Sequence, residues 1–550
     1  MKQTQLVFSL LLSLLFLCGT LSAQISEGGT PPSFQYAKES RLRHGETISR
    51  IVMPIDFDVQ KLKAEDAANE ALGDVPLNAV RIIPADLTME NSGEWSTLPN
   101  GQNVWQLTIE APDAIAITLC YREFYIPQGG KLFIYNEAKT QVLGAYTSTA
   151  NPANRGFATE LVAGDVITLE YVAPDEIGSD RPRIRIEGVG YGYNHIRVFS
   201  NVVSEKYGES LDCQVNVVCS EGDEWRNQIN GVTRLMMRKT PTTYSWCSGA
   251  IVNNVRGDFK PYLLTAYHCV DETDSYFMDQ SQFYFHYEYA NCGDTSGTAS
   301  EPQSKTMIGA QLLVISPTDG GSDGALLLLN DHIPVEYDVY YNGFDVSASP
   351  PAATNASGGT IGIHHPKGDV KKISTSSSKI TSTTWKSTNN TGKADAHWRI
   401  PNYVATLHGY SFPESGSSGS PLFDRNTGLI IGTLTGGNTS NCETASGRYS
   451  SYGKLAYHWN GSPGESDWMK SYLDPDNTGV TIVQGTYDTD GTGIKPVDAN
   501  DVIVATKYYN LLGQLVGAQN VVSLQTGVYI VKNIHASGRV STSKILKIAQ

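Results

Sequence analysis

The chain has 550 residues, a formal net charge of -15 and a pI near 5.2. A single core cannot accommodate this length, so several domains are expected, and the acidic balance excludes the concentrated positive charge that nucleic-acid binding requires. Tyrosine (29 residues) and glycine (52 residues) are abundant while helical periodicity is sparse, which predicts a mostly β protein.

Residues 1–23 are typical of a secretory signal peptide. Lys2 precedes an apolar block at 6–17, and small residues follow the block. The block is too short to span a membrane, and no other segment has the length of apolar sequence that a spanning helix needs. We therefore expect a secreted or cell-surface protein with no transmembrane segment in its mature form.

Residues 24–206 are expected to form a β-rich module of their own. Alternating apolar and polar residues at 104–109 and 131–135 predict strands, and an Ala- and Glu-rich stretch at 60–72 predicts a helix. Cys120 is the single cysteine of this region. No constellation of side chains here indicates chemistry, so a propeptide is the simplest role.

Residues 207–486 carry three chemically informative segments. An apolar run at 262–266 predicts a strand that ends just before His268, Asp323 lies in a Ser-Asp-Gly turn, and Ser418 lies in Gly-Ser-Ser-Gly-Ser-Pro at 416–421. The last segment could be a flexible Gly/Ser loop. However, a hairpin turn and a buried strand at 428–434 follow it, and flexible linkers lack such a continuation.

The order His268, Asp323, Ser418 is the order of the chymotrypsin class. A serine hydroxyl is a poor nucleophile at neutral pH, so it needs an imidazole as base and a carboxylate that orients the imidazole. Glycines beside Ser418 allow backbone N–H groups to approach an oxyanion, which makes Gly416 and Ser418 the predicted oxyanion-hole donors. This chemistry acts on protein or peptide substrates and requires no metal or organic cofactor.

Six of the eight cysteines lie in this segment, and export makes disulfides the expected state. Six cysteines allow fifteen pairings, which residue spacing alone does not resolve. A zinc site is the competing interpretation, but no Cys-x-x-Cys pair occurs.

The last region, residues 487–550, begins with a linker at 488–493 and has strand-like runs at 502–505, 527–531 and 543–548. These runs predict a small β domain.

Further motifs extend over the segment from 207 to 485. They are Cys-x5-Cys-x-Glu-Gly-Asp at 213–223, Leu-Thr-Ala-x-His-Cys at 264–269, Ile-His-His-Pro at 363–366, 416–421, and Asp-Trp at 467–468 with Leu-Asp-Pro at 473–475. With these motifs the segment resembles bacterial lysyl endopeptidases of the chymotrypsin-like class. The resemblance implies an all-β, double β-barrel peptidase. It also implies the disulfides Cys213 with Cys442, Cys219 with Cys292, and Cys247 with Cys269.

The resemblance also implies a substrate cleft. Trp385 matches an aromatic residue that lines the family's specificity pocket, and Gly436 and Gly437 match the backbone that pairs with the substrate. Thr435 replaces the family's pocket histidine, and the carboxylate at the pocket base falls at or beside Ser451.

The tract 448–452 therefore lacks the acid that would bind a substrate lysine, and a buried ammonium without a counter-charge is costly. Glu414 is the nearest substitute and Glu443 a second. Lysine before the cut bond is the expected preference. An acidic or small polar residue is the alternative, because Thr435 and Ser451 offer hydroxyls. A non-catalytic surface adhesin on the same scaffold is the alternative of another class.

Activation must differ from that of trypsins, because Ser417 occupies the place of the Asp that captures the freed N-terminal ammonium. We expect a zymogen activated by removal of the preceding module, and Lys206 before Tyr207 is a candidate cleavage point. The adjacent His364 and His365 have no further ligand at metal-binding spacing, so a structural role is expected.

The C-terminal region contains Tyr-Asn-x2-Gly-Gln at 509–514, the run 526–531, and Lys-Ile-Leu-Lys at 544–547. In these residues it resembles the sorting domains of type IX secretion cargo. The resemblance implies a short β-sandwich and the secretion machinery as a partner. A small accessory β domain is the alternative.

Overall fold

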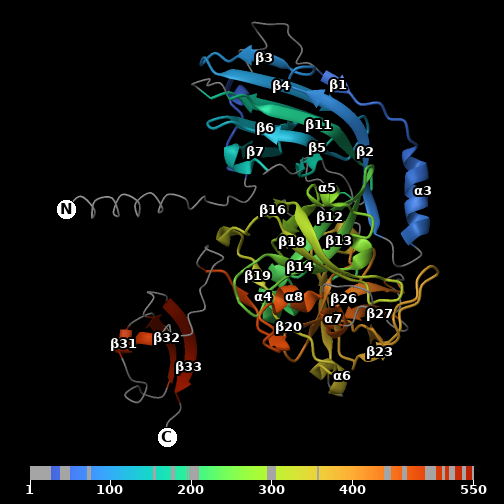
Figure 1. Ribbon diagram of the computed structural model, residues 1–550, viewed down its shortest axis with the longest axis vertical. Helices are drawn as coiled ribbons and strands as arrows, with labels where there is room; N and C mark the ends of the chain where they lie inside the picture. The colour runs from blue at the N-terminus through green and yellow to red at the C-terminus, as the bar shows by residue number, and fades with distance from the viewer. Residues whose placement is uncertain are drawn as a thin grey trace, which may run out of the picture. The chain divides into compact units, whose positions relative to one another are not determined.

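The computed structural model describes residues 26–36, 50–70, 76–152, 156–174, 180–194, 196, 210–293, 305–355, 358–438, 442, 448–460, 468–489, 503–510, 515–518, 527–535 and 540–547 (Figure 1). The predicted signal peptide, the predicted cleavage point after Lys206, and Glu443 lie outside these residues. The chain divides into two compact units, 1–493 and 494–550.

The N-terminal part of the first unit contains a sheet and one longer helix. The helix is α3 (Val59–Glu70), where a helix was predicted at 60–72. The sheet has the strands β1 (Arg50–Val52), β3 (Glu94–Thr97), β4 (Asn103–Glu110), β6 (Lys131–Asn136), β7 (Val142–Tyr146) and β10 (Val166–Val172). Leu107 and Ile109 alternate with polar neighbours and are fully buried, as a half-buried strand requires.

A second sheet runs from this N-terminal part into the next. Its N-terminal strands are β2 (Leu77–Thr88), β5 (Ala116–Tyr125), β8 (Phe157–Ala158), β9 (Val162–Ala163) and β11 (Arg183–Gly192). Strand β2 pairs with β11 on one side and with β13 (Thr243–Val252) on the other, so residues from both sides of position 207 share one hydrogen-bonded sheet. Figure 1 shows β2 descending from the N-terminal part beside β13.

The next part contains two antiparallel β-barrels. The first is built from β12 (Val232–Thr240), β13, β14 (Tyr262–Thr265), β15 (Gln282–Phe285), β16 (Lys305–Ile308), β17 (Ala310–Ser316) and β18 (Gly324–Leu329). The predicted strand at 262–266 is β14, and each of its residues is buried. A run buried on both faces is apolar throughout, which explains the absence of alternation there.

The second barrel has the order β22-β21-β25-β26-β27-β24-β23, with β20 paired to β26 and β28 paired to β20. The bounds are β20 (Phe344–Asp345), β21 (Thr360–His364), β22 (Lys372–Ser376), β23 (Thr381–Thr383), β24 (His397–Ile400), β25 (Pro421–Asp424), β26 (Ile430–Gly437), β27 (Ser450–Lys454) and β28 (Ile482–Val483). One buried cluster contains Leu264 and Leu326 of the first barrel and Phe423 and Ile430 of the second, so the barrels pack on a common core.

Short helices and one small strand pair complete the first unit. They are α4 (Arg226–Gly231), α5 (Ser275–Met278), α6 (Pro351–Thr354), α7 (Leu455–Asn460), α8 (Met469–Leu473), and β19 (Tyr340–Tyr341) paired with β29 (Thr486–Tyr487). No helix in the described part of the chain combines the length and apolar character that a bilayer crossing requires.

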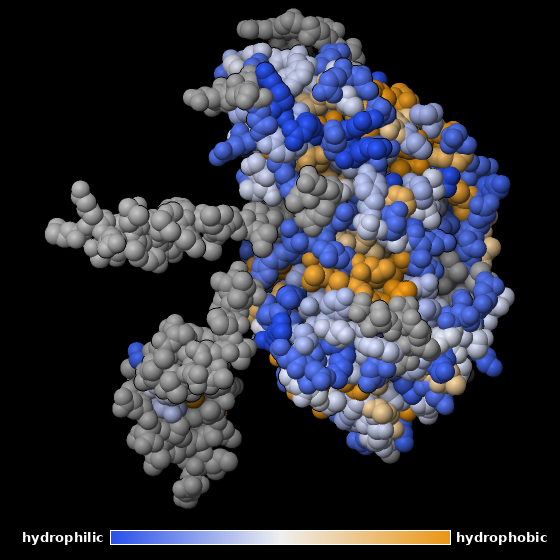
Figure 2. All heavy atoms as spheres, viewed as in Figure 1, coloured by the Kyte–Doolittle hydropathy of each residue, from blue (hydrophilic) through white to orange (hydrophobic). Residues whose placement is uncertain are grey.

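The described residues of the second unit form one antiparallel sheet in the order β31-β30-β32-β33. Its strands are β30 (Ile503–Tyr509), β31 (Leu515–Ala518), β32 (Gly527–His535) and β33 (Val540–Lys547), which coincide with the three predicted strand-like runs and add one strand. In the first unit, hydrophilic residues cover most of the face seen in Figure 2, with smaller hydrophobic areas between them.

Candidate active site

His268 lies immediately after β14, in a short 3-10 helix (Tyr267–Cys269) at the end of the first barrel. Its Nδ1 is 2.8 Å from Asp323 Oδ2, and its backbone N–H donates to Asp323 Oδ1 at 3.0 Å. Burial alone would lower the pKa of His268, but the Asp323 carboxylate raises it above its ordinary value. Within the described part of the chain Nε2 is buried and has no hydrogen-bond partner, so this nitrogen is available to accept a proton.

Asp323 immediately precedes β18 and adopts a left-handed backbone conformation, with φ +58°. The Thr318 hydroxyl donates to Asp323 Oδ1 at 2.7 Å. Burial alone would raise the pKa of Asp323, but His268 and the Thr318 hydroxyl hold it below its ordinary value. The carboxylate is fully buried and therefore stays ionised through hydrogen bonds rather than through water.

Ser418 lies in the loop before β25 of the second barrel, and this loop packs against the segment that carries His268. The Ser418 carbonyl accepts from Ser248 N at 2.8 Å and lies 3.7 Å from Cys269 Sγ. Gly419 has φ +79°, and a Cβ there would lie 2.6 Å from Ala266 N. Only glycine permits this approach, which brings the loop of Ser418 beside the residue pair before His268.

The backbone N–H groups around Ser418 differ in their partners. Ser417 N donates to Glu414 O and Gly419 N to Leu434 O. Among the described residues, neither Gly416 N nor Ser418 N takes part in a hydrogen bond. The two N–H groups predicted as oxyanion donors therefore have no acceptor among the described residues.

The conformation of Gly416 is fixed by its surroundings. Its φ is +88°, and a Cβ would lie 2.9 Å from Gly368 N. The Ser248 hydroxyl donates to Gly416 O at 2.9 Å, which fixes the orientation of the peptide. Ser248 and Thr318 were not predicted from the sequence, because neither stands in a recognisable motif and both act only through contacts made in the folded chain.

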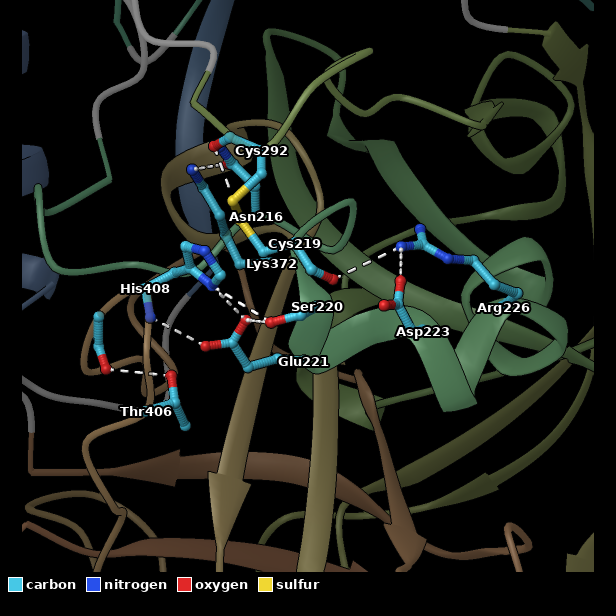
Figure 3. The surroundings of a disulfide bond; sticks show 11 residues. Asn216, Cys219, Ser220, Glu221, Asp223, Arg226, Cys292, Lys372, Thr406 and His408 are labelled. Carbon is cyan, nitrogen blue, oxygen red and sulfur yellow. Dashed lines mark hydrogen bonds and ion pairs between the residues drawn. A yellow bond between two sulfur atoms is a disulfide. The ribbon is translucent and has the colours of Figure 1, made fainter.

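Three disulfides join the pairs that the family resemblance implies, Cys213 with Cys442, Cys219 with Cys292, and Cys247 with Cys269. The third links β13 to the short helix of His268. Figure 3 shows the surroundings of Cys219 and Cys292, where His408 approaches the sulfurs and Glu221. These sulfurs are consumed by the disulfide, so this group of side chains offers no thiolate to a metal.

The histidine pair at 364 and 365 is buried in the second barrel. His364 contacts the Ser417 hydroxyl through Nδ1 at 2.9 Å and the Ser374 hydroxyl through Nε2. Burial lowers the pKa of His364 to about 3, so the ring is neutral. Ser417, which replaces the acid of trypsins, is thus held by a neutral imidazole.

The predicted cleft residues lie on β26 and β27. Gly436 and Gly437 pair with Ser451 and Ser450 of β27 and are half-buried. The ladder between β25 and β26 ends at Thr433, and backbone bonds between Leu434 and residues 419–420 follow it, so β25 does not pair with the two glycines. The register shifts at Thr435, whose hydroxyl is buried and has no partner within the described residues.

Glu414 and Trp385 also lie near these strands. Glu414 is buried, and its Oε1 accepts from Leu211 N at 3.1 Å and from Gln214 Nε2 at 2.6 Å. Burial raises the pKa of Glu414 above its ordinary value. Trp385 is buried with its ring centroid 6.4 Å from that of His397 on β24.

Arg448, which was not predicted as a site residue, lies two residues before β27. Its side chain is buried, and its guanidinium lies over the Phe412 ring at 3.9 Å. The signal available in the sequence was a cation in the tract where the family has an acid.

The two barrels define a chymotrypsin-like double-barrel fold, with the buried His268–Asp323 pair on the first barrel and the loop of Ser418 before β25 of the second. Residues 207–453 match the family model for the C-terminal domain of lysyl endopeptidase. This segment of the chain is therefore similar to that family.

A curated relative is the lysyl endopeptidase of Pseudomonas aeruginosa strain PAO1, which is 24% identical over 339 residues. The alignment covers 60% of this chain and 67% of the relative. This similarity supports the assignment of the chain as a peptidase that acts on protein substrates.

Similar solved structures include the Rv3671c protease of M. tuberculosis, with 13% identity, a TM-score of 0.27, and coverage of 46% of this chain and 90% of that one. The protease Anisep of Arthrobacter nicotinovorans has 18% identity, a TM-score of 0.27, and coverage of 42% and 91%. The double-barrel fold is defined by the strand pairing described above and not by these scores.

Proposed function

We propose that this chain is a secreted serine endopeptidase in which Ser418 attacks the peptide bond, His268 acts first as base and then as acid, and Asp323 orients His268. The observation that carries the proposal is the buried His268–Asp323 pair, bonded through Nδ1 at 2.8 Å, with Nε2 left without a partner among the described residues. An imidazole held in this way has its free nitrogen available to a serine hydroxyl.

The reaction follows from these groups. Ser418 Oγ bonds to the carbonyl carbon while His268 Nε2 takes its proton, and the carbonyl oxygen becomes an oxyanion that Gly416 N–H and Ser418 N–H can stabilise. The C–N bond then breaks as the imidazolium gives its proton to the departing amine. Water, activated by the same nitrogen, hydrolyses the acyl-enzyme and restores Ser418.

The substrate strand is proposed to pair with the edge of Gly436 and Gly437 with which β25 does not pair. Addition of an extended strand to a sheet edge supplies main-chain hydrogen bonds that do not depend on side chains.

Lysine before the cut bond is the preference that the family name implies, and it stays a hypothesis. Ser451 and Thr435 are neutral, and the Glu414 carboxylate already accepts two hydrogen bonds. A lysine ammonium buried here would need a counter-charge. These observations favour the second candidate, the same chemistry with an acidic or small polar residue before the cut bond.

Residues 24–206 are proposed to be a propeptide that is removed on activation. The pairing of β2 with β13 and the ion pair between Glu70 and Lys367 support a specific association with the peptidase before cleavage. Residues 487–550 are proposed to be a sorting domain that is recognised by the secretion machinery.

The proposal is tested with an activated ester substrate and a mixed peptide library. Acyl transfer by Ser418 predicts a burst of released alcohol in proportion to the enzyme, followed by slower turnover. Wild-type rates of peptide hydrolysis by Ser418→Ala would overturn it. The non-catalytic adhesin predicts neither burst nor hydrolysis.

A further inference from the structure

Arg448 lies where the substrate cleft meets the end of β27. Asn438 N donates to Tyr449 O at 3.2 Å, and Tyr449 N donates to Asn438 Oδ1 at 2.6 Å. These bonds continue the pairing of Gly437 with Ser450 and hold Arg448 next to the half-buried end of β26.

The guanidinium points toward the segment that leads to Ser418. Its carbon lies 3.9 Å from the centre of the Phe412 ring and 4.9 Å from that of Tyr410. Gln214 Nε2 donates to Phe412 O at 2.7 Å, which fixes the backbone that carries this ring. The cation therefore lies between the tract 448–452, where the resemblance places the base of the specificity pocket, and the segment that leads to Ser418.

The nitrogens of Arg448 have no hydrogen-bond partner. Nε, Nη1 and Nη2 are all buried without one in the part of the chain that the structure describes, and the residue is 2% exposed. The aromatic faces attract the cation but accept no hydrogen bonds in the guanidinium plane. An unpaired buried guanidinium is costly, and a carboxylate is the group that fits it through two parallel bonds.

The nearest described acid does not supply these bonds. Glu414 attracts Arg448 electrostatically, but its Oε1 is bonded to Leu211 N and Gln214 Nε2. Burial favours the protonated form of Glu414 by raising its pKa. The Arg448 guanidinium is therefore available to the carboxylate of a bound substrate.

We infer that Arg448 determines specificity by binding the carboxylate of a Glu or Asp side chain that precedes the cut bond, with the unpartnered Thr435 hydroxyl as a second donor. This inference rests on the proposed serine peptidase function and names its substrate class. The nitrogens are covered in the substrate-free chain, so binding includes a movement of the covering side chains. Shielding from water then strengthens the ion pair that forms.

The test uses the full chain after activation and four peptides that differ only before the cut bond, with Glu, Gln, Lys or Ala. Gln matches Glu in shape and lacks its charge. The wild type is expected to cleave the Glu peptide with kcat/KM about 10- to 100-fold above that for Gln, since hydrogen bonds to charged groups have this effect. Arg448→Met is expected to bring the ratio near one while Ala turnover changes less than about threefold.

Arg399→Met is the matched control. Arg399 lies on neighbouring β24, opposite Ser451, and stacks on Tyr449 at 3.6 Å, but it is half-exposed. It should keep the wild-type ratio of Glu to Gln cleavage. An unchanged ratio in Arg448→Met, or a wild type that cleaves Lys best, would overturn the inference.

Labelling of Ser418 by a fluorophosphonate separates the two hypotheses. A labelled enzyme that cleaves no Glu peptide overturns the role of Arg448 alone, whereas absence of both labelling and turnover overturns the proposed function and this inference with it. If Arg448→Met does not fold, competitive inhibition of the wild type by product peptides tests the role of Arg448 instead. A product ending in Glu should then bind about tenfold more tightly than one ending in Gln, and equal binding would count against Arg448.

Discussion

The His268–Asp323 centre and the region around Arg448 are both buried, but they differ in how their polar groups are paired. The Asp323 carboxylate accepts hydrogen bonds from His268 and Thr318, whereas Arg448 and the Thr435 hydroxyl have no partner within the described residues. A reaction centre must hold its geometry without substrate, so its groups are bonded to one another. A recognition site can leave its groups unpaired until the substrate supplies the bonds.

Replacement of the nucleophile tests the reaction centre most severely. Ser418→Ala should lower kcat by about 10⁶-fold, the loss found when the nucleophile of such a unit is removed. Ser420→Ala is the matched control, because the Ser420 hydroxyl lies in the same loop and has no partner among the described residues. Peptide hydrolysis should fall only in the first variant, and equal losses in both would contradict a special role of Ser418.

Asp323→Asn should lower kcat/KM by about 10⁴-fold, because it disturbs the imidazole tautomer while keeping the shape of the site. It should also move the pH profile. Only neutral His268 accepts the proton, and Asp323 raises its pKa, so wild-type activity should fall as pH decreases through a pKa above about 6.5. Without the carboxylate the pKa falls and the loss should occur at lower pH. If the pH midpoint of activity were the same in Asp323→Asn as in the wild type, Asp323 would not control the pKa of His268.

Thr318→Val removes one hydrogen bond to a buried carboxylate and keeps the shape of the side chain. We expect kcat to fall about 3- to 30-fold with little change in KM, and the free energy of unfolding to fall by about 1–2 kcal/mol. Thr233→Val is the control, since the Thr233 hydroxyl is buried in β12 without a partner in the described chain. Steady-state kinetics and urea unfolding measure both effects, and a larger loss in Thr233→Val would count against the role of Thr318.

The smallest effect is expected at the recognition site. Thr435→Val replaces an unpartnered hydroxyl with a methyl group, so the free energy of unfolding should stay the same or rise by up to about 1 kcal/mol. The same Thr→Val substitution is therefore expected to lower the free energy of unfolding at Thr318 and to leave it unchanged or raise it at Thr435. Destabilisation of Thr435→Val by as much as Thr318→Val would mean that the pocket is bonded as completely as the reaction centre.

The reaction centre and the recognition site also differ in how well their residues could be predicted from the sequence. His268, Asp323 and Ser418 belong to residue types that the reaction requires, and each follows or precedes a strand whose pattern is visible. The strands at 262–266 and 428–434, the helix near 60–72 and the C-terminal strand runs were predicted close to their observed positions.

The pairing of β2 with β13 could not be predicted, because it joins segments more than 150 residues apart and no local pattern specifies a partner strand. For a related reason, the sequence did not predict the roles of Thr318, Ser248 and Arg448. Their roles depend on which atoms approach them in the fold. Threonine, serine and arginine are common in β proteins, so their presence in the sequence does not by itself indicate a role.

The central claim is that Ser418 carries the acyl group, and stoichiometric labelling tests it most directly. The activated protein is treated with a fluorophosphonate, its residual peptidase activity is followed, and the modified residue is located by mass spectrometry of its peptides. The account predicts one adduct per chain on Ser418, with activity lost in proportion to labelling. Full activity in completely labelled protein, or inactivation with the adduct on another residue, would contradict it.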